Sequence, residues 1–176
     1  MIIVNLFGAP GAGKSTGAAY VFSKLKMAGI NAELVTEFVK DKVWEESKAV
    51  FQNQAYIFGK QYFRISRLQD KVDVVITDSP ILLSSFYNND EVLGKELDAL
   101  ISKVFDSYQN YNVFINRVKE YNPAGRFQTE KESDTLSIDL INFLNEHGIA
   151  CRHYDGSIEG YDTLVADILI EFTKKE

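Results

Sequence analysis

The residues with the clearest chemical meaning lie near the N-terminus, in the segment Gly8-Ala9-Pro10-Gly11-Ala12-Gly13-Lys14-Ser15, called the P-loop below. Its spacing is that of the phosphate-binding pattern G-x-x-x-x-G-K-[ST], and it lies between an apolar stretch and a segment of helical period. Glycines allow backbone amides to surround a phosphate, and a helix N-terminus adds partial positive charge. Lys14 is expected to neutralise the β- and γ-phosphates, Ser15 to bind Mg²⁺ and Thr16 to contact phosphate. The segment predicts a nucleoside triphosphate site, with ATP and Mg²⁺ as expected ligands.

A carboxylate follows a second apolar stretch, residues 72–77, at Asp78. Parallel strands deliver ligand-binding residues at their carboxyl ends, so Asp78 can bind Mg²⁺ or accept a proton from an attacking hydroxyl. Capping of a helix after Pro80 is the alternative role. Ser79 follows Asp78 where mechanical and remodelling ATPases have a second acid, which disfavours motor-like hydrolysis. The sequence also lacks the D-x-x-G and N-K-x-D patterns of guanine-nucleotide switches.

Glu37 ends another strand-like segment and is expected at the same edge of a parallel sheet. A carboxylate there can orient or deprotonate an acceptor hydroxyl, and plain surface exposure is the alternative. The sequence leaves open whether Asp78 or Glu37 is the base on the acceptor side. Further candidate acceptor contacts lie in the segment 50–69: Gln54, Lys60, Gln61 and Arg64.

Basic residues gather in a segment with Pro and Gly that follows the fourth strand-like stretch. We interpret residues of about 117–130 as a lid, with Arg117 and Arg126 as its main cations and Lys119 as a weaker third. Arginines on a closing lid stabilise the charge that spreads over a transferred phosphoryl group, and they help to exclude water. Ordinary exposed loop charges are the alternative interpretation.

One long helix is predicted between residues 50 and 69 because apolar residues recur there every three or four positions, namely Phe51, Ala55, Phe58, Tyr62 and Ile65. A second stripe is basic and consists of Lys60, Arg64, Arg67 and Lys71. A solvated helix face is its simpler explanation. A landing surface for a DNA strand is the functional alternative.

Short apolar segments alternate with longer segments of helical period, which predicts an α/β fold with a parallel sheet covered on both faces. Strands are expected at residues 2–7, 32–36, 72–77, 112–116 and 150–154. Helices are expected from the P-loop to Ala28, over 50–69, from a capping box at Thr129 to Gly148, and from about Asp162 onward. We expect one domain over residues 1–176.

Composition narrows the class of protein. The chain has 176 residues, of which 45% are apolar, so it can build one substantial core. Its net charge of -6 disfavours a protein that coats duplex DNA, although residues 1–126 carry +1 and residues 127–176 carry -7. A single cysteine, Cys151, excludes an internal disulfide and favours the cytoplasm. No apolar run approaches the roughly 20 residues that span a membrane.

The P-loop with Thr16, Glu37, the turn Thr77-Asp78-Ser79-Pro80 and the segment Asn122-Pro123-Ala124-Gly125-Arg126 together resemble the small P-loop kinases related to the nicotinamide riboside kinase domain. This nucleoside and nucleotide kinase-like family includes bacteriophage members. The resemblance covers nearly the whole chain. It implies a three-layer fold with strand order 2-3-1-4-5. It also implies that Asp78 or Glu37 is the acceptor-side carboxylate and that residues 156–161 lie near the adenine.

These observations favour a Mg²⁺-dependent kinase that transfers the γ-phosphoryl group of ATP to a nucleoside, nucleotide or related riboside. A DNA-directed kinase that acts on a 5′-hydroxyl or a hydroxymethylated base is one alternative. A nucleotide-binding regulator with slow ATP hydrolysis is another. The sequence leaves open the acceptor, the choice between ATP and GTP, and whether the protein is a monomer or a homodimer.

Overall fold

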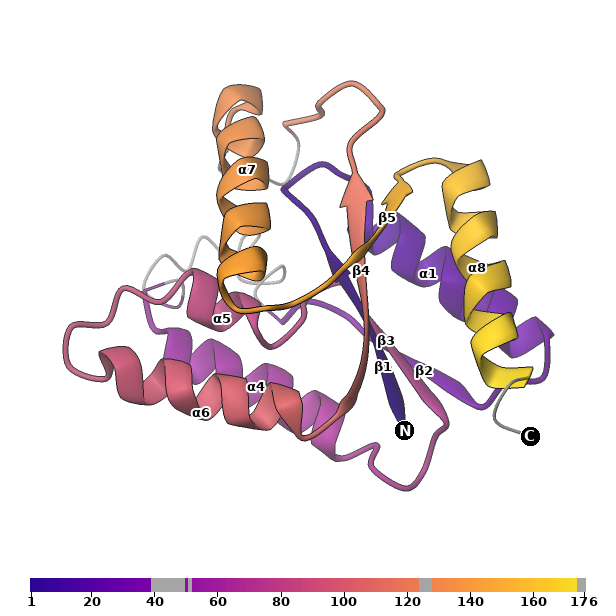
Figure 1. Ribbon diagram of the computed structural model, residues 1–176, viewed down its shortest axis with the longest axis horizontal. Coiled ribbons are helices and arrows are strands. Elements are labelled where there is room, and N and C mark those ends of the chain that lie inside the picture. The colour runs from indigo at the N-terminus through magenta and orange to yellow at the C-terminus, as the bar shows by residue number, and fades with distance from the viewer. Residues whose placement is uncertain (39–49, 51, 124–127, 174–176) are drawn as a thin grey trace.

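The computed structural model describes residues 1–38, 50, 52–123 and 128–173 (Figure 1). Strands and helices alternate along these ranges. Their bounds are β1 (Ile2–Phe7), α1 (Lys14–Met27), β2 (Ala32–Val35), α4 (Gln54–Ser66), β3 (Val74–Thr77), α5 (Leu83–Phe86), α6 (Gly94–Asp106), β4 (Gln109–Asn116), α7 (Glu130–Glu146), β5 (Arg152–Asp155) and α8 (Ile158–Thr173).

The described strands form one five-stranded parallel sheet in the order β2-β3-β1-β4-β5. β1 lies in the centre, where Ile2 pairs with Val74 of β3 and with Gln109 of β4. Every residue of β1 and of β3 is buried, because helices cover both faces of the sheet. The predicted fold class and the strand order implied by the resemblance are both confirmed.

Two helical layers enclose the sheet (Figure 1). On one face α1 and α8 pack together, and Val21 and Leu164 belong to the core on that side. On the other face α4, α6 and α7 contribute Phe58, Ile101 and Leu140 to a second core. The fold is therefore a three-layer α/β sandwich.

The carboxyl ends of all five strands lie at one edge of the sheet, because the strands are parallel. The P-loop follows β1, Glu37 lies just beyond β2, and Asp78 follows β3 directly. Arg117 follows β4 and Gly156 follows β5. The topology thus collects the predicted site residues that the structure describes at a single edge.

Local signals set several element boundaries where they were expected. β1 spans residues 2–7, and α1 ends just before Gly29, which has a left-handed φ of 84°. The capping box of α7 forms: the Thr129 hydroxyl accepts from the Glu132 amide at 3.3 Å, and the Glu132 carboxylate accepts from the Thr129 amide at 2.7 Å. Gly148, with φ of 68°, follows the end of the same helix.

Other boundaries differ from the expectation. α4 begins at Gln54 rather than near residue 50, because the Asn53 side chain caps it by accepting from the Tyr56 amide at 2.9 Å. Of its predicted apolar positions, Phe51 lies outside the described residues and Tyr62 is 37% exposed. Gln54 and Gln61 are buried instead, and Gln61 bonds to groups at the carboxyl ends of β2 and β3.

The predicted elements do not include α6, although its sequence carries the signal of an amphipathic helix. Leu97, Ile101 and Phe105 recur every four residues, and all three are buried. α8 also begins earlier than predicted, at Ile158, so the loop after β5 is short. Within the described ranges, no helix is long and apolar enough to cross a bilayer.

Replacement of Ile101 by alanine tests the packing of α6 against the sheet. Ile101 is fully buried, so Ile101→Ala is expected to lower the free energy of unfolding by about 2–5 kcal/mol in urea denaturation. Leu100→Ala is the matched control, because Leu100 is its neighbour and is 50% exposed. An equal loss in both variants would contradict the described packing.

Candidate active site

The P-loop has a backbone shape that only glycine adopts readily. Gly8, Gly11 and Gly13 have φ values of 143°, 85° and 103°. A Cβ at Gly8 would lie 2.8 Å from the Ile115 carbonyl oxygen, and a Cβ at Gly13 would collide with the Tyr161 hydroxyl. The spacing of the glycines is therefore required by the conformation of the loop and by its close neighbours.

Side chains hold four carbonyl groups of the P-loop. The Lys14 ammonium donates to the carbonyls of Gly8 at 2.7 Å and Ala9 at 3.1 Å. The Ser133 hydroxyl of α7 donates to the Pro10 carbonyl at 2.6 Å, and the Tyr161 hydroxyl of α8 donates to the Gly13 carbonyl at 2.9 Å. In a planar trans peptide the N–H points opposite to the C=O, so these contacts orient the amides of the loop. Such a cradle fits a phosphate group.

The first turn of α1 presents hydroxyl groups beside this cradle. Gly13 precedes α1 in a left-handed conformation, and Lys14 is the first residue of the helix. Ser15 and Thr16 follow, and both are exposed. The first turn of α1 therefore presents an ammonium group and two hydroxyl groups next to the P-loop, and the prediction that they bind a magnesium triphosphate concerns these groups.

Asp78 ties the ends of β2 and β3 together. Its carboxylate accepts a hydrogen bond from the backbone amide of Glu37 at 2.9 Å, and the residue is only 3% exposed. The helix that follows Pro80, α5, has Leu82 at its N-cap and no side-chain cap. The alternative role of Asp78 as a helix cap is therefore wrong, since the carboxylate bonds to the neighbouring strand end.

Tyr87, which follows α5, lies close to Glu37. The pKa of Tyr87 is raised to about 12, first by desolvation of its hydroxyl and second by the negative charge of Glu37, although 42% of the residue as a whole is exposed. The tyrosine therefore stays protonated at neutral pH and can serve as a hydrogen-bond donor. No spacing in the sequence pointed to Tyr87, because the effect of the Glu37 charge on it depends on the folded structure.

α4 shapes the segment that carries Glu37. Gln61 is 2% exposed, accepts from the Phe38 amide at 3.3 Å and donates to the Thr77 hydroxyl at 3.3 Å. Arg64 donates to the Thr36 carbonyl at 3.0 Å and lies over the Phe38 ring. The two predicted acceptor contacts Gln61 and Arg64 therefore lie against the end of β2 and position Glu37.

The predicted basic stripe of α4 does not form one uniform face. Arg64 is half-buried against the β2 end, whereas Lys60 and Arg67 are exposed. The Lys60 ammonium lies 5.4 Å from the centre of the Tyr56 ring, and Phe63 is 65% exposed. Exposed cations and aromatic rings thus alternate along the outer side of the helix.

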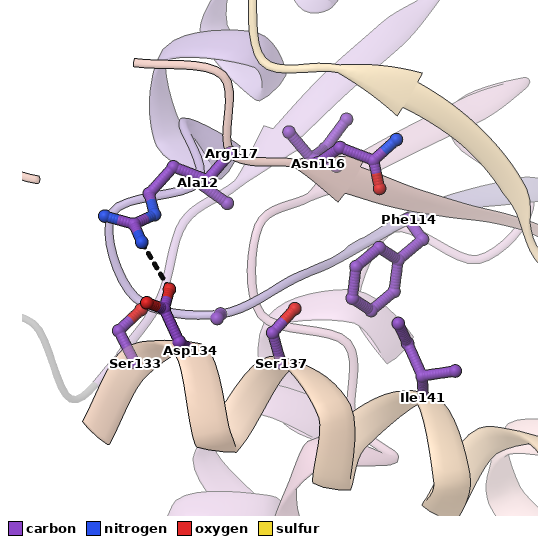
Figure 2. Close-up of a pocket in the computed structure, with 10 residues that line it drawn as sticks. Ala12, Phe114, Asn116, Arg117, Ser133, Asp134, Ser137 and Ile141 are labelled. Carbon is purple, nitrogen blue, oxygen red and sulfur yellow. Dashed lines mark hydrogen bonds and ion pairs between the residues drawn. The ribbon is translucent and has the colours of Figure 1, made fainter. Parts of the chain in front are cut away.

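Among the lid cations, Arg117 is held by acids at the start of α7. It donates to Glu130 at 2.7 Å. It also pairs with Asp134, as the dashed line in Figure 2 marks. These hydrogen bonds raise its pKa above the ordinary value. The Lys119 ammonium lies against the P-loop, 3.6 Å from the position that a Cβ at Gly13 would occupy. Arg126 lies outside the described residues.

A cavity of about 250 Å³ lies between the P-loop, the end of β4 and the first turns of α7 (Figure 2). Its walls combine apolar groups such as Phe114 and Ile141 with Arg117, Ser133 and Ser137. Ala9 and Ala12 of the P-loop also line this cavity. The cavity was not predicted from the sequence. The Ser133 hydroxyl was not predicted as part of the site either, and Tyr161 was expected only as the last residue of the segment 156–161 near the adenine.

Solved nucleoside kinase structures share this architecture. The structure of deoxyadenosine kinase from M. mycoides with bound dATP matches with a TM-score of 0.62 and 17% identity, covering 97% of this chain and 99% of that one. A second structure of that kinase, with products dCMP and a flexible dCDP bound, matches with a TM-score of 0.53 and 16% identity, covering 98% and 99%. The chain therefore has the fold of a small P-loop kinase.

A family model described as an AAA domain matches residues 3–160. The chain belongs to this family, which places it among the P-loop NTPases. Its fold is that of the small P-loop kinases, as the resemblance implied. No curated protein matches the sequence.

Removal of the Lys14 side chain tests the phosphate cradle. A charged hydrogen-bond donor contributes about 1.5–3 kcal/mol, so Lys14→Ala is expected to weaken Mg·ATP binding by about 10- to 150-fold in calorimetry. Lys24→Ala is the matched control. Lys24 lies in the last turn of the same helix, and its ammonium group lies over the Tyr20 ring rather than at the P-loop. An unchanged dissociation constant for Lys14→Ala would refute the proposed triphosphate site.

Proposed function

We propose that this protein is a kinase that transfers the γ-phosphoryl group of ATP to a nucleoside, a nucleotide or a related riboside. The observation that carries the proposal is the hydrogen bond between the Asp78 carboxylate and the Glu37 amide. It joins two acidic residues at the sheet edge where the P-loop cradle also lies. A donor site and a pair of acids beside it are the parts that phosphoryl transfer to a hydroxyl requires.

The two acids have different surroundings, which supports different roles. Asp78 is buried and fixed by the Glu37 amide, whereas the Glu37 residue is half-buried and lies close to Tyr87. We assign Glu37 as the base that accepts the proton of the acceptor, and Asp78 as a residue that would bind Mg²⁺ directly or through water. The acceptor oxygen then bonds to the γ-phosphorus, its proton passes to Glu37, and ADP leaves with the bridging oxygen.

The P-loop residues supply the binding of ATP in this proposal. Lys14 and the amides of residues 8–16 hold the phosphate tail, with Thr16 as a further contact. Ser15 and Asp78 would hold Mg²⁺, directly or through water, and the bound ion would supply positive charge against the phosphates. Among the described residues no three acids, histidines or cysteines cluster as a protein cage for a metal. Magnesium sites of kinases use one or two protein ligands and the phosphates themselves.

The solved relatives support a nucleoside-type acceptor. One structure of the deoxyadenosine kinase holds dATP and another holds the products dCMP and dCDP. An acceptor of this class would lie near Gln61, Arg64 and Glu37, at the end of β2. A kinase of such metabolites would work in the cytoplasm, where ATP is abundant.

A screen of acceptors with radiolabelled ATP tests the function. Ribosides, deoxynucleosides and their monophosphates are offered in turn, and at least one is expected to be phosphorylated well above the rate of ATP hydrolysis. Glu37→Gln is expected to lower kcat by about 10²- to 10⁴-fold, because a general base contributes that much, while ATP affinity stays near wild type. Formation of only ADP and free phosphate with every acceptor would refute the kinase and favour a hydrolytic regulator.

The outer side of α4 favours a second candidate, a kinase that acts on DNA. Lys60 and Arg67 alternate there with the exposed rings of Tyr56 and Phe63, which is the combination that binds a single strand. An oligonucleotide with a 5′-hydroxyl or a hydroxymethylated base is therefore included in the screen. Phosphorylation of DNA would fall steeply with salt, whereas phosphorylation of a small acceptor would change little.

We propose that Arg117 and Arg126 belong to a lid of about residues 117–130 and act on the transferred group. To reach phosphate, Arg117 must exchange Glu130 and Asp134 for phosphate oxygens. Arg117→Ala and Arg126→Ala are each expected to lower kcat at least tenfold, with ATP affinity changed less than threefold, because such contacts form in the transition state. Wild-type turnover in either variant would remove that arginine from the lid assignment.

A further inference from the structure

We infer that Ser133 and Tyr161 are positioning residues, which orient the amides of the P-loop from two helices distant in the sequence. The inference rests on the proposed function in one respect, namely that the P-loop binds a triphosphate. Neither residue belongs to the phosphate-binding pattern. Each instead places a buried hydroxyl on a carbonyl of the loop.

Ser133 lies in the first turn of α7, directly after the capping box. It is fully buried, and its hydroxyl donates at 2.6 Å to the carbonyl of Pro10, 123 residues earlier in the chain. A serine inside a helix commonly bonds to a carbonyl of its own helix. Ser133 reaches across to the P-loop instead, so its hydroxyl joins two separate parts of the structure.

Tyr161 makes the corresponding contact from α8. It is 3% exposed, and its hydroxyl donates at 2.9 Å to the carbonyl of Gly13. The ring lies so close that a Cβ at Gly13 or at Gly17 would collide with it. The absence of side chains at these two glycines therefore makes room for the tyrosine ring.

The effect of these hydroxyls follows from the peptide geometry. When the Pro10 carbonyl is fixed toward Ser133, the amide of Gly11 in the same planar peptide must point the other way. Gly11 has a φ of 85° and no side chain, so this peptide would otherwise rotate easily. The Tyr161 contact fixes the amide of Lys14 through the Gly13 carbonyl in the same manner. Amides that are already oriented bind an anion more tightly, because less freedom is lost on binding.

The same turn of α7 also holds the lid cation. Asp134, next to Ser133, pairs with Arg117, as Figure 2 shows. Glu130, one turn earlier, pairs with the same arginine. The start of α7 thus connects the P-loop to the segment that follows β4.

Removal of each hydroxyl tests the inference. Ser133→Ala is expected to weaken Mg·ATP binding by about threefold to tenfold, the value of one hydrogen bond. Tyr161→Phe is expected at the lower end of that range, because the Gly13 carbonyl also accepts from the Gly17 amide at 2.8 Å. The affinity for adenosine, which lacks phosphates, is expected to stay unchanged in Ser133→Ala, because Ser133 lies outside the segment 156–161 that is expected near the adenine. In turnover, KM for ATP should rise while kcat stays within twofold.

Conservative variants separate positioning from a merely structural role. Ser133→Thr keeps the hydroxyl, and the adjoining cavity of about 250 Å³ offers space for its methyl group, so ATP affinity should return to near wild type. Tyr20→Phe and Ser137→Ala are matched controls. The Tyr20 hydroxyl bonds to Asp162, and Ser137 lies one turn further along α7. Both controls should bind ATP like wild type.

The outcomes distinguish this inference from the proposed function. Wild-type ATP affinity in both Ser133→Ala and Tyr161→Phe, or an equal loss of affinity for adenosine and ATP, would overturn the positioning roles alone. Tyr161→Phe keeps the ring and decides the question if Ser133→Ala does not fold. Selective loss for ATP would support the inference even if no acceptor is phosphorylated. Absence of ATP binding in the wild-type protein would overturn both proposals.

Discussion

The orientation of the peptide groups in the P-loop is the constraint on which the rest of the structure depends. Three glycines allow the loop to turn with positive φ, and contacts from Lys14, Ser133 and Tyr161 fix its carbonyls. The loop begins directly after β1, the central strand of the sheet, and it leads into the first turn of α1. The conformation of the loop, on which the proposed phosphate binding would depend, is therefore set by several packed elements and not by the eight-residue pattern alone.

The parallel sheet explains how distant acids come to this place. β3 lies between β1 and β2, so the residues after β3 and β2 are neighbours of the P-loop edge. The hydrogen bond from the Glu37 amide to Asp78 then sets the relation between the two acids. α4 supports the arrangement through Gln61, which bonds to both the β2 end and Thr77. Burial of Gln61 is thus explained by its hydrogen bonds at the strand ends near the site.

Much of the fold could be predicted from the sequence because the signals are local. The glycine pattern, the capping box at Thr129 and the apolar strands are short-range features, and the structure confirms them. The contacts of Ser133, Tyr161 and Tyr87 could not be predicted, since each depends on the packing of elements far apart in the chain. The rotated face of α4 was missed for the same reason, because the site edge needs Gln61 on the inside.

A crystal structure with Mg²⁺ and a non-hydrolysable ATP analogue tests the central claim most directly. The account predicts that the β- and γ-phosphates lie within hydrogen-bond distance of the P-loop amides. It also predicts that the Lys14 ammonium has moved from the Gly8 and Ala9 carbonyls to the phosphates, with the Ser133 contact to Pro10 retained. Phosphates bound at another place, or Lys14 still on those carbonyls with the analogue in the site, would contradict it.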